Sequence, residues 1–223
     1  MAGILFIISA PSGSGKSTLV NGVRALVPGL EFSVSYTTRA PRGSEKEGVE
    51  YHFIEKAKFQ AMIAEDKFLE YAVVFGDNYY GTAMSALDEA RDRGHDLLLD
   101  IDVQGALQVM KRVPEAVSIF ILPPSPQILE MRLRNRSQAE GVTDDSVIER
   151  RLAQARSELE MLSRYQYAIV NDQLDTATDE MKAIVLHERH EQNGDAKTAE
   201  SCLTRTHSAR LDAALSNFAL MQA

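Results

Sequence analysis

The sequence predicts an α/β fold built on a mostly parallel sheet. Short continuous apolar runs alternate with segments of helical periodicity over residues 4–189, which is the pattern of buried parallel strands joined by crossover helices. A glycine-rich segment at residues 10–18 lies between the first apolar run and the first helical segment. Such a segment is typical of a loop that binds phosphate groups. The 223 residues are enough for one sizeable core carrying small subdomains.

The elements follow from apolar periodicity and from the residues that interrupt it. The expected strands are the apolar runs at residues 4–10, 32–36, 51–54, 68–75, 96–101, 116–122 and 167–170. The expected helices cover residues 16–26, 56–65, 83–93, 103–112, 125–135, 146–165 and 176–189. Pro28 stops the first helix, Gly94 caps the third and Pro114 ends the fourth. Residues 37–50 are expected to form a loop and residues 76–78 a turn.

Composition excludes several classes of protein. Apolar residues make up 44% and charged residues 25%, as in ordinary globular proteins. No apolar run approaches the roughly 20 residues of a membrane helix. The N-terminus has neither the basic region nor the long apolar stretch of a secretory signal, so we expect none. The net charge of −8 argues against nucleic-acid binding. Cys202, the single cysteine, excludes an intramolecular disulfide, so we expect a free thiol in a cytoplasmic protein without membrane or nucleic-acid partners.

The glycine-rich loop nearly matches the pattern G-x4-G-K-[ST], with Gly15, Lys16 and Ser17 in place and Ala10 at the first glycine position. Alanine is acceptable there if its backbone keeps a negative φ. Lys16 is expected to reach the β- and γ-phosphates, and the hydroxyl of Ser17 to bind Mg²⁺. The loop residues expected to bind the phosphates of a nucleoside triphosphate are Ala10, Pro11, Ser12, Gly13, Ser14, Gly15, Lys16, Ser17 and Thr18; the resemblance described below implies that this nucleotide is ATP.

Asp100 ends a buried apolar run, which is where a second carboxylate directed at Mg²⁺ is expected in this fold class. A strand-end cap is the competing interpretation. The loop indicates a nucleotide but does not separate kinases from other nucleotide-binding proteins, so that distinction needs further residues.

Arg39 and Arg42 lie three residues apart in the polar segment that follows Thr37 and Thr38. Paired arginines outside a helix suit a phosphate dianion, because each can donate a forked pair of hydrogen bonds. Taken alone, the pair is better explained as solvated surface arginines.

Taken together, several blocks resemble the guanylate kinase family over about residues 3–189. The first block reads T-T-R-x-x-R-x-x-E-x-x-G-x-x-Y-x-F at residues 37–53. The blocks that follow it in order occupy residues 68–72, 76–82, 99–105, 121–125, 132–136 and 169–172. The resemblance implies a nucleoside monophosphate kinase of the P-loop type, with a five-stranded parallel core sheet flanked by helices, a small mixed α/β GMP-binding domain and a lid. The implied reaction is ATP + GMP → ADP + GDP, with Mg²⁺.

The resemblance also implies a division of the chain. A guanylate kinase-like domain would cover residues 1–189, with a core at 1–32, 94–123 and 147–189, a GMP-binding part at 33–93 and a lid at 124–146. Residues 190–223 lie outside it and are expected to be a mobile or weakly helical tail, with a partner-binding helix as the second interpretation. Deleting this tail should then leave catalysis nearly intact. Oligomeric state stays open.

Site roles are carried over residue by residue from the matching blocks. The residues implied to hold or surround GMP are Ser35, Arg39, Arg42, Tyr51, Tyr80, Glu70, Thr82, Asp100 and Asp102, the last with Glu70 and Thr82 near the guanine. Arg132 and Asn171 match positions near the ATP adenine, and Arg136 and Arg151 match lid arginines. The implied catalytic residues are Lys16, Arg39, Arg42, Arg136 and Arg151, and the implied metal residues are Ser17 and Asp100. Which of Asp100 and Asp102 serves the metal and which the base stays open.

The chemistry of guanine supports this assignment independently. Guanine presents N1–H and N2–H₂ as adjacent donors that a carboxylate such as Glu70 accepts, whereas adenine would leave that carboxylate unpaired, and such mismatches allow roughly 10⁴-fold discrimination. A kinase acting on a phosphorylated sugar such as ribose 1,5-bisphosphate is one alternative, and Glu70, Thr82 and Asp102 argue against it. A catalytically inactive scaffold domain that binds phosphopeptides is another, and the intact loop and lid arginines argue against it.

Overall fold

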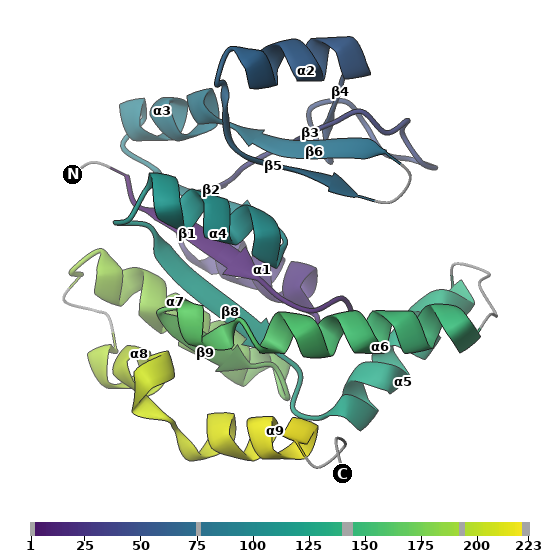
Figure 1. Cartoon of the computed structure of the whole chain (residues 1–223). Coiled ribbons are helices and arrows are strands. Elements are labelled where there is room, and N and C mark those ends of the chain that lie inside the picture. Colours follow the sequence, from purple (N-terminus) through teal and green to yellow (C-terminus); the bar gives the residue numbers. More distant parts are fainter. Residues whose placement is uncertain (1–2, 75–76, 140–144, 192–194, 220–223) are drawn as a thin grey trace. The chain divides into compact units, whose positions relative to one another are not determined.

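The computed structural model describes residues 3–74, 77–139, 145–191 and 195–219, and two sheets organise them (Figure 1). The larger sheet has five parallel strands in the order β2-β7-β1-β8-β9, and the smaller sheet has four strands in the order β4-β3-β6-β5. The predicted α/β class with a five-stranded parallel sheet is confirmed. The turn expected at residues 76–78 and the lid expected at 124–146 fall partly outside the described residues.

The chain divides into two compact units, Met1–Ile7 with Gly29–Val117 and Ile8–Pro28 with Ser118–Ala223. The division into core, GMP-binding part and lid stays a prediction. The strands of the first unit, with β1 shared by the two, are β1 (Leu5–Ser9), β2 (Leu30–Phe32), β3 (Tyr36–Thr37), β4 (His52–Phe53), β5 (Phe68–Val74), β6 (Asn78–Ala83) and β7 (Asp96–Asp100). Its helices are α2 (Lys56–Ala64), α3 (Met84–Asp92) and α4 (Val103–Arg112).

Strand β6 was not expected from the sequence, which placed a turn and a helix around it. It pairs antiparallel with β5 and with β3, so it is an interior strand of the smaller sheet. Aromatic and β-branched residues favour a strand there, but Gly81 interrupts the apolar pattern. Gly81 is needed because a Cβ would lie 2.9 Å from the carbonyl oxygen of Glu70 and 3.0 Å from the ring of Phe59. The close approach of β5 therefore explains a residue that the pattern treated as a break.

The second unit contains the remaining elements. They are α1 (Lys16–Leu26), β8 (Val117–Leu122), α5 (Pro126–Ala139), α6 (Asp145–Leu159), the short 3-10 helix η1 (Leu162–Arg164), β9 (Tyr167–Val170), α7 (Leu174–Glu188), α8 (Ala196–Ser201), the short 3-10 helix η2 (Thr204–Thr206) and α9 (Ala209–Ala219). Strands β8 and β9 are parallel and buried along their whole lengths. The single helix expected at residues 146–165 is instead α6 followed by η1.

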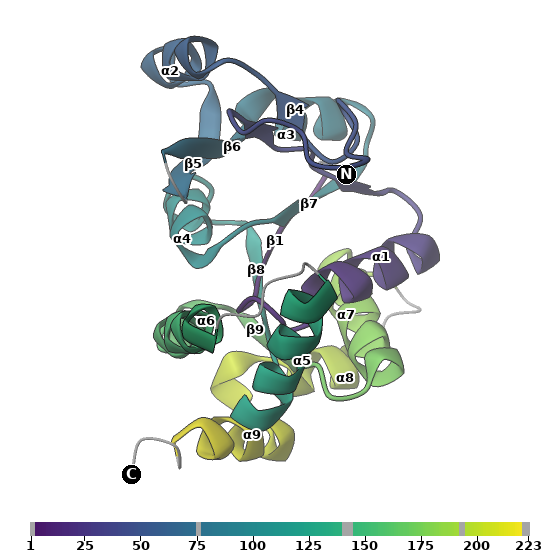
Figure 2. The same cartoon turned by 90° about the vertical axis from the view of Figure 1, so that its right-hand side faces the viewer.

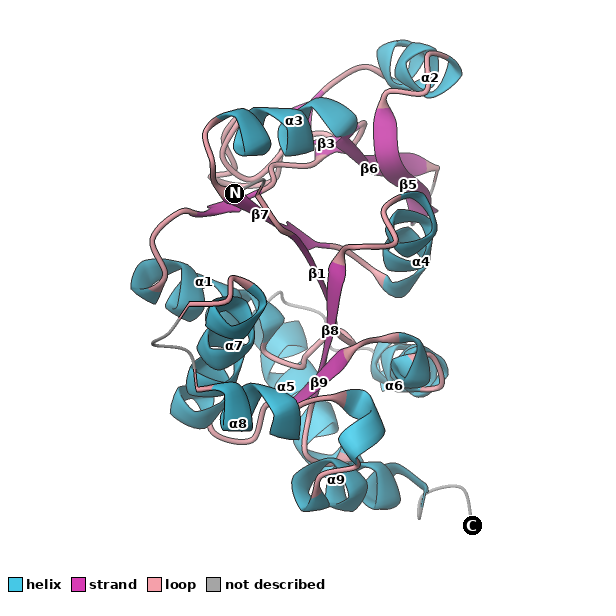
Figure 3. Cartoon of the chain, turned by 90° about the vertical axis from the view of Figure 1, so that its left-hand side faces the viewer, coloured by secondary structure: helices cyan, strands magenta, loops and turns pink. Residues whose placement is uncertain are grey.

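The sequence suggested a mobile or weakly helical tail beyond residue 189. Within residues 195–219 the structure has α8, η2 and α9, which follow α7 beside β9 (Figure 3). Leu203 forms an antiparallel bridge with Tyr167, and the carbonyl of Cys202 accepts a 2.8 Å hydrogen bond from the amide of Ala168. The tail therefore covers an edge strand whose backbone groups would otherwise be unpaired. Burial of the Cys202 thiol raises its pKa to about 12.

No helix among residues 3–74, 77–139, 145–191 and 195–219 is long and apolar enough to cross a membrane.

Candidate active site

The glycine-rich loop connects β1 to α1 and has the backbone that its glycines suggested. Gly13 and Gly15 have φ values of 90° and 83°, in the left-handed region that favours glycine. A Cβ on Gly15 would also lie 2.5 Å from Nδ2 of Asn171. Ala10 is absent from the described non-glycine residues with positive φ, as alanine at the first position requires. The loop leads into the N-terminus of α1, and the positive end of the helix dipole attracts an anion there.

Two side chains from distant parts of the second unit meet at this loop. Nδ2 of Asn171 donates to the carbonyl oxygen of Ser14 at 2.7 Å, and Nη1 of Arg132 donates to the same oxygen at 3.3 Å. Nη2 of Arg132 also donates to the carbonyl oxygen of Asn171 at 3.0 Å. Partial burial lowers the pKa of Arg132. Arg132 and Asn171, the two residues expected near the adenine, are therefore hydrogen-bonded to each other, and both are hydrogen-bonded to the loop at Ser14.

The two arginines expected in the lid lie on helices of the second unit. Arg136 is exposed in the last turn of α5. Arg151 lies on α6, and its Nη1 donates to the hydroxyl of Ser137 on α5 at 3.3 Å. The two helices therefore present their arginines from adjacent positions. Residues 140–144, which belong to the expected lid, lie outside the described residues.

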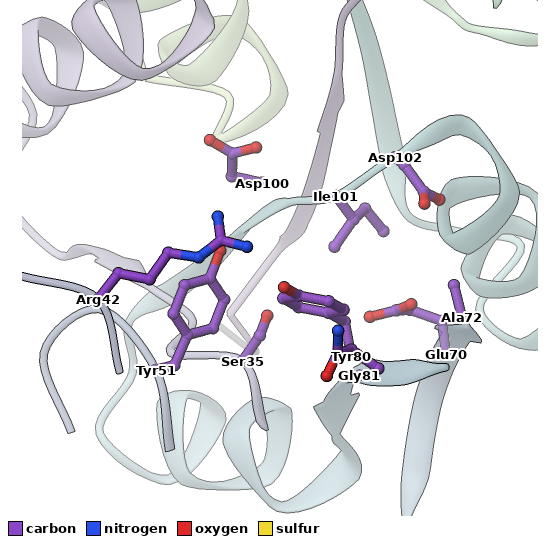
Figure 4. Close-up of a pocket in the computed structure, with 11 residues that line it drawn as sticks. Ser35, Arg42, Tyr51, Glu70, Ala72, Tyr80, Gly81, Asp100, Ile101 and Asp102 are labelled. Carbon is purple, nitrogen blue, oxygen red and sulfur yellow. The ribbon is translucent and has the colours of Figure 1, made fainter. Parts of the chain in front are cut away.

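The first unit contains a pocket of about 320 Å³, a volume suited to a small ligand. Its lining residues are Ser35, Arg42, Tyr51, Glu70, Ala72, Asn78, Tyr80, Gly81, Asp100, Ile101 and Asp102. Figure 4 shows Arg42, Tyr51 and Asp100 toward one end, and Glu70 and Asp102 toward the other. The pocket therefore brings together seven of the nine residues expected to bind GMP. The other two do not line the pocket but are hydrogen-bonded to lining residues, Arg39 to Tyr80 and Thr82 to Glu70.

Glu70 is the most deeply buried charged side chain in this pocket, with 5% of its surface exposed. It lies opposite Thr82 in the β5–β6 pair, and the hydroxyl of Thr82 donates to its Oε1 at 2.8 Å. Burial raises its pKa to about 7; the negative charge of Asp102 adds to this shift and the Thr82 hydrogen bond opposes it. Burying an ionised carboxylate costs free energy unless hydrogen-bond donors are paired with it. Glu70 therefore favours a ligand that brings such donors.

Gly105 and Asp102 shape the same end of the pocket. Oδ1 of Asp102 caps α4 by accepting a 2.7 Å hydrogen bond from the amide of Gly105. A Cβ on Gly105 would lie 2.6 Å from Oε2 of Glu70. Gly105 is therefore a site residue that the sequence analysis missed. Its place in the 99–105 block was the available signal, because a glycine in the first turn of a helix usually reflects close approach of another group.

The opposite end of the pocket separates the two arginines that the sequence treated as a pair. Arg42 lines the pocket, whereas Nη1 and Nη2 of Arg39 donate to the two carboxylate oxygens of Glu45, each at 2.9 Å. Nε of Arg39 donates to the hydroxyl of Tyr80 at 3.0 Å. The amide of Arg42 also donates to Glu45, at 2.7 Å. The hydrogen bonds from Arg39 lower the pKa of Glu45, and the same pairing raises the pKa of Arg39.

Glu45 is thus a second site residue that the sequence analysis did not assign, although it stands in the 37–53 block. It ties Arg39 to the backbone of Arg42, which lines this end of the pocket. A bidentate arginine–carboxylate pair has fixed geometry, and Arg39 is half enclosed by the rings of Tyr51 and Phe53, at 5.3 Å and 5.9 Å from its guanidinium carbon.

Within the described ranges, no group of three or more His, Cys, Asp or Glu residues is arranged to hold a metal ion. Ser17 is exposed at the start of α1, and Asp100 is half-buried at the end of β7.

Comparison with known proteins gives one consistent result. Residues 3–188 match the family model described as guanylate kinase. A protein named guanylate kinase from Koribacter versatilis (strain Ellin345) is 52% identical over 227 residues, which cover 98% of this chain and 97% of the relative. One of the same name from Alkalilimnicola ehrlichii is 46% identical over 190 residues, covering 85% of this chain and 91% of the relative. The crystal structure of guanylate kinase from Anaplasma phagocytophilum superposes with a TM-score of 0.65 at 32% identity, over 90% of this chain and 95% of that one.

Proposed function

The chain belongs to the guanylate kinase family, and from that premise we propose how its residues divide the ATP-dependent phosphorylation of GMP to GDP. The enzyme is a phosphotransferase whose substrates are ATP and GMP. In the proposal, the 320 Å³ pocket of the first unit binds GMP, and the glycine-rich loop of the second unit binds the phosphates of ATP.

The observation that carries the GMP assignment is the buried Glu70 carboxylate with its Thr82 donor. Its oxygens retain lone pairs for N1–H and N2–H₂ of guanine, and Asp102 stands at the same end. Adenine offers an acceptor at N1 and would leave the carboxylate buried without a donor. Guanine selectivity therefore follows from the cost of an unpaired buried charge.

At the other end we propose that Arg42, Tyr51 and Ser35 contact the GMP phosphate. Arg39 holds Tyr80 in place and reinforces the positive charge there, while Glu45 fixes both arginines. The position of Asp100 toward this end favours a role near the phosphates, and the position of Asp102 beside Glu70 favours the base. We therefore propose Asp100 for the phosphate end and Asp102 for the base.

For ATP, the proposal assigns the phosphates to the N–H groups of residues 10–18, with Lys16 on the β- and γ-phosphates. The absence of a side chain at Gly15, where a Cβ would crowd Asn171, supports a close approach of phosphate to the loop backbone. Arg132 and Asn171 stand against Ser14 and are proposed to face the adenine side. Mg²⁺, when bound with ATP, would be held by the hydroxyl of Ser17 with a contribution from Asp100, and it supplies charge neutralisation at the phosphates.

Phosphoryl transfer depends on positioning and on neutralising charge, since the phosphate oxygen of GMP is already ionised and needs no general base. We propose that Arg136, within a lid at residues 124–146, and Arg151, on α6 just beyond it, approach the transferred group. Closure of that lid would exclude water and so prevent hydrolysis of ATP. ATP is the donor and the chain carries a net charge of −8, so we propose a cytoplasmic enzyme that binds no nucleic acid.

The test is a coupled assay of ADP release with GMP, dGMP, AMP, UMP and ribose 1,5-bisphosphate as acceptors. We expect GMP and dGMP to be used and AMP to react roughly 10⁴-fold more slowly in kcat/KM. Equal rates with AMP and GMP would contradict the role of Glu70. A faster reaction with ribose 1,5-bisphosphate would contradict the assignment of the whole pocket.

A further inference from the structure

The C-terminal helix α9 packs on the second unit through one apolar face. Leu211, Ala214 and Phe218 are buried at helical spacing, and Figure 2 shows α9 at the lower end of α5. Nδ2 of Asn217 donates to the carbonyl oxygen of Pro124 at 3.1 Å, just before α5 begins. None of the sequence blocks that resemble the family includes this helix.

Arg210 connects α9 to the residues on both sides of Asn171. Its Nη2 donates to the carbonyl oxygen of Val170 and to Oδ1 of Asp172, each at 2.7 Å. Its Nη1 donates to Glu180 on α7. A guanidinium can satisfy three acceptors in a fixed plane, which restricts the backbone between Val170 and Asp172.

Asn171 is in turn the residue that holds the phosphate loop. It is 5% exposed, and its Nδ2 donates to the carbonyl of Ser14 at 2.7 Å and stands where a Cβ on Gly15 would be. The first connection therefore runs from Arg210 through the backbone around Asn171 to Ser14 and Gly15. The hydrogen bonds to Val170 and to Ser14 lie among buried or half-buried groups, so we expect a displacement at one end to reach the other.

A second connection runs through side-chain packing. Phe218 belongs to one buried cluster with Leu129 and Leu133 of α5 and Ile148 of α6. On the other side, a Cβ on Gly13 would lie 3.1 Å from side-chain atoms of both leucines. Leu129 and Leu133 thus lie next to Gly13 of the phosphate loop and share a buried cluster with Phe218 of α9.

We infer that α9 positions the phosphate loop for ATP, with Arg210 and Phe218 as positioning residues that act through Asn171 and through Leu129 and Leu133. The inference rests on the proposed assignment of this loop to ATP. Loop N–H groups bind phosphate only when aligned, and a loosened supporting shell misaligns them. The structure therefore argues against the expectation that residues 190–223 can be deleted without effect on catalysis.

The test compares full-length Arg210→Ala and Phe218→Ala with wild type by titration calorimetry with ATP and, separately, with GMP, below the melting temperature of each variant. We expect the Kd for ATP to rise about fivefold in each variant, the range for changes along a packed network. The Kd for GMP should stay within about twofold of wild type, because its pocket lies in the other unit. Phe218→Leu, which keeps an apolar side chain in the cluster, should recover most of the ATP affinity.

Arg205→Ala is the matched control, because Arg205 is an exposed arginine of the same tail, and both affinities should stay at wild-type values. A lower melting temperature with unchanged ATP affinity would show a purely structural helix and overturn the inference. Equal weakening of ATP and GMP would overturn it as well, and so would a Phe218→Leu variant no better than Phe218→Ala. If wild type binds ATP but releases no ADP with GMP, the proposed function fails, while the ATP titrations still decide the role of α9.

Discussion

Thr82 donates its hydroxyl proton to Oε1 of Glu70 at 2.8 Å, across the antiparallel pair of β5 and β6. The register of β5 shifts between Phe68 and Glu70, so the carboxylate turns into the pocket although Leu69 beside it is also buried. A strict alternation would place these two side chains on opposite faces of the sheet. The register shift therefore coincides with the burial of a carboxylate in the pocket.

Replacing Glu70 by glutamine should weaken GMP far more than ATP. The amide keeps one acceptor but places a donor against the donors of guanine, and loss of a charge-assisted pair costs about 3 kcal/mol, or roughly 100-fold in the KM for GMP. Steady-state kinetics with each nucleotide varied will show this. Glu65→Gln, an exposed glutamate of the same unit, is the control and should behave as wild type. A similar rise in the KM for ATP would contradict the assignment.

The raised pKa of Glu70 makes stability depend on pH in a defined window. The folded pKa of about 7 exceeds the ordinary value of 4.5, so the folded state holds an extra proton between these values. Stability of the unliganded protein should fall as pH rises from 4.5 through 7, by up to roughly 3 kcal/mol. Denaturant unfolding at pH 5, 6, 7 and 8 measures this change. Glu70→Gln should remove that part of the slope and be more stable than wild type at pH 8.

GMP binding should be linked to the same proton. Guanine donors favour the ionised carboxylate, so binding near or below pH 7 should release a proton from Glu70. Calorimetry in two buffers of different ionisation enthalpy gives the number released. The phosphate of GMP titrates near this range too, so the difference between wild type and Glu70→Gln is the informative quantity. The same proton release in both would remove Glu70 from the linkage.

A methyl group at Gly105 should disturb the guanine end. The added Cβ would lie 2.6 Å from Oε2 of Glu70, so the carboxylate must move away from its place opposite Thr82. We expect Gly105→Ala to raise the KM for GMP about tenfold with little effect on ATP. Gly22→Ala is the control, because its Cβ would meet Thr178 at an ordinary 3.5 Å and alanine favours a helix by about 1 kcal/mol. Equal kinetics of Gly105→Ala and wild type would show that this carboxylate has room to shift.

Loss of the charge on Glu45 should weaken the phosphate end of the pocket. Glu45→Gln breaks the bidentate pair with Arg39 and weakens the hold on the amide of Arg42. The KM for GMP should rise about fivefold, while guanosine, which lacks the phosphate, should inhibit with unchanged affinity. Glu50→Gln tests the specificity of the effect, since Glu50 accepts from the amide of Lys46 in the same loop without touching either arginine. Weaker guanosine inhibition would place the effect at the base instead.

Lys16→Ala should remove most catalysis while the fold survives. Lys16 opens α1 directly after Gly15, and loss of one charge that stabilises a transferred phosphoryl group costs about 10²- to 10³-fold in kcat. Lys111→Ala, an exposed lysine at the end of α4, should keep full activity. Melting temperatures of all three proteins check the fold. Turnover near that of wild type would end the role assigned to Lys16.

Local sequence was sufficient wherever a residue's own backbone or immediate neighbours determine its structure. The bounds of α1, α4 and β9 agree with those expected from periodicity and from their terminal signals. The left-handed conformations of Gly13 and Gly15 follow from the loop pattern in the same way. Strand β6 was missed because its interior glycine is explained only by a neighbouring strand that lies far away in the sequence.

The pairing of functional side chains depended on contacts that no local pattern contains. Arg39 and Arg42 have the same chemistry and lie three residues apart, yet only the position of Glu45 makes one a support and the other a lining residue. In the same way, residues 190–223 look polar and loosely helical in sequence. The burial of residues such as Cys202 and Phe218 within 195–219 depends on an edge strand and on an apolar cluster provided by α5 and α6.

The glycine pattern, the order of the motif blocks and the chemistry of guanine were enough to predict a kinase that uses ATP and GMP. That prediction succeeded because phosphate cradles and base-reading groups need particular residue types at particular spacings. The elevated pKa of Glu70, the division of work between Arg39 and Arg42, and the support of the loop by α9 emerged only in the folded chain. Each of these depends on burial or on distances between residues from distant segments, and a linear sequence does not specify either quantity directly.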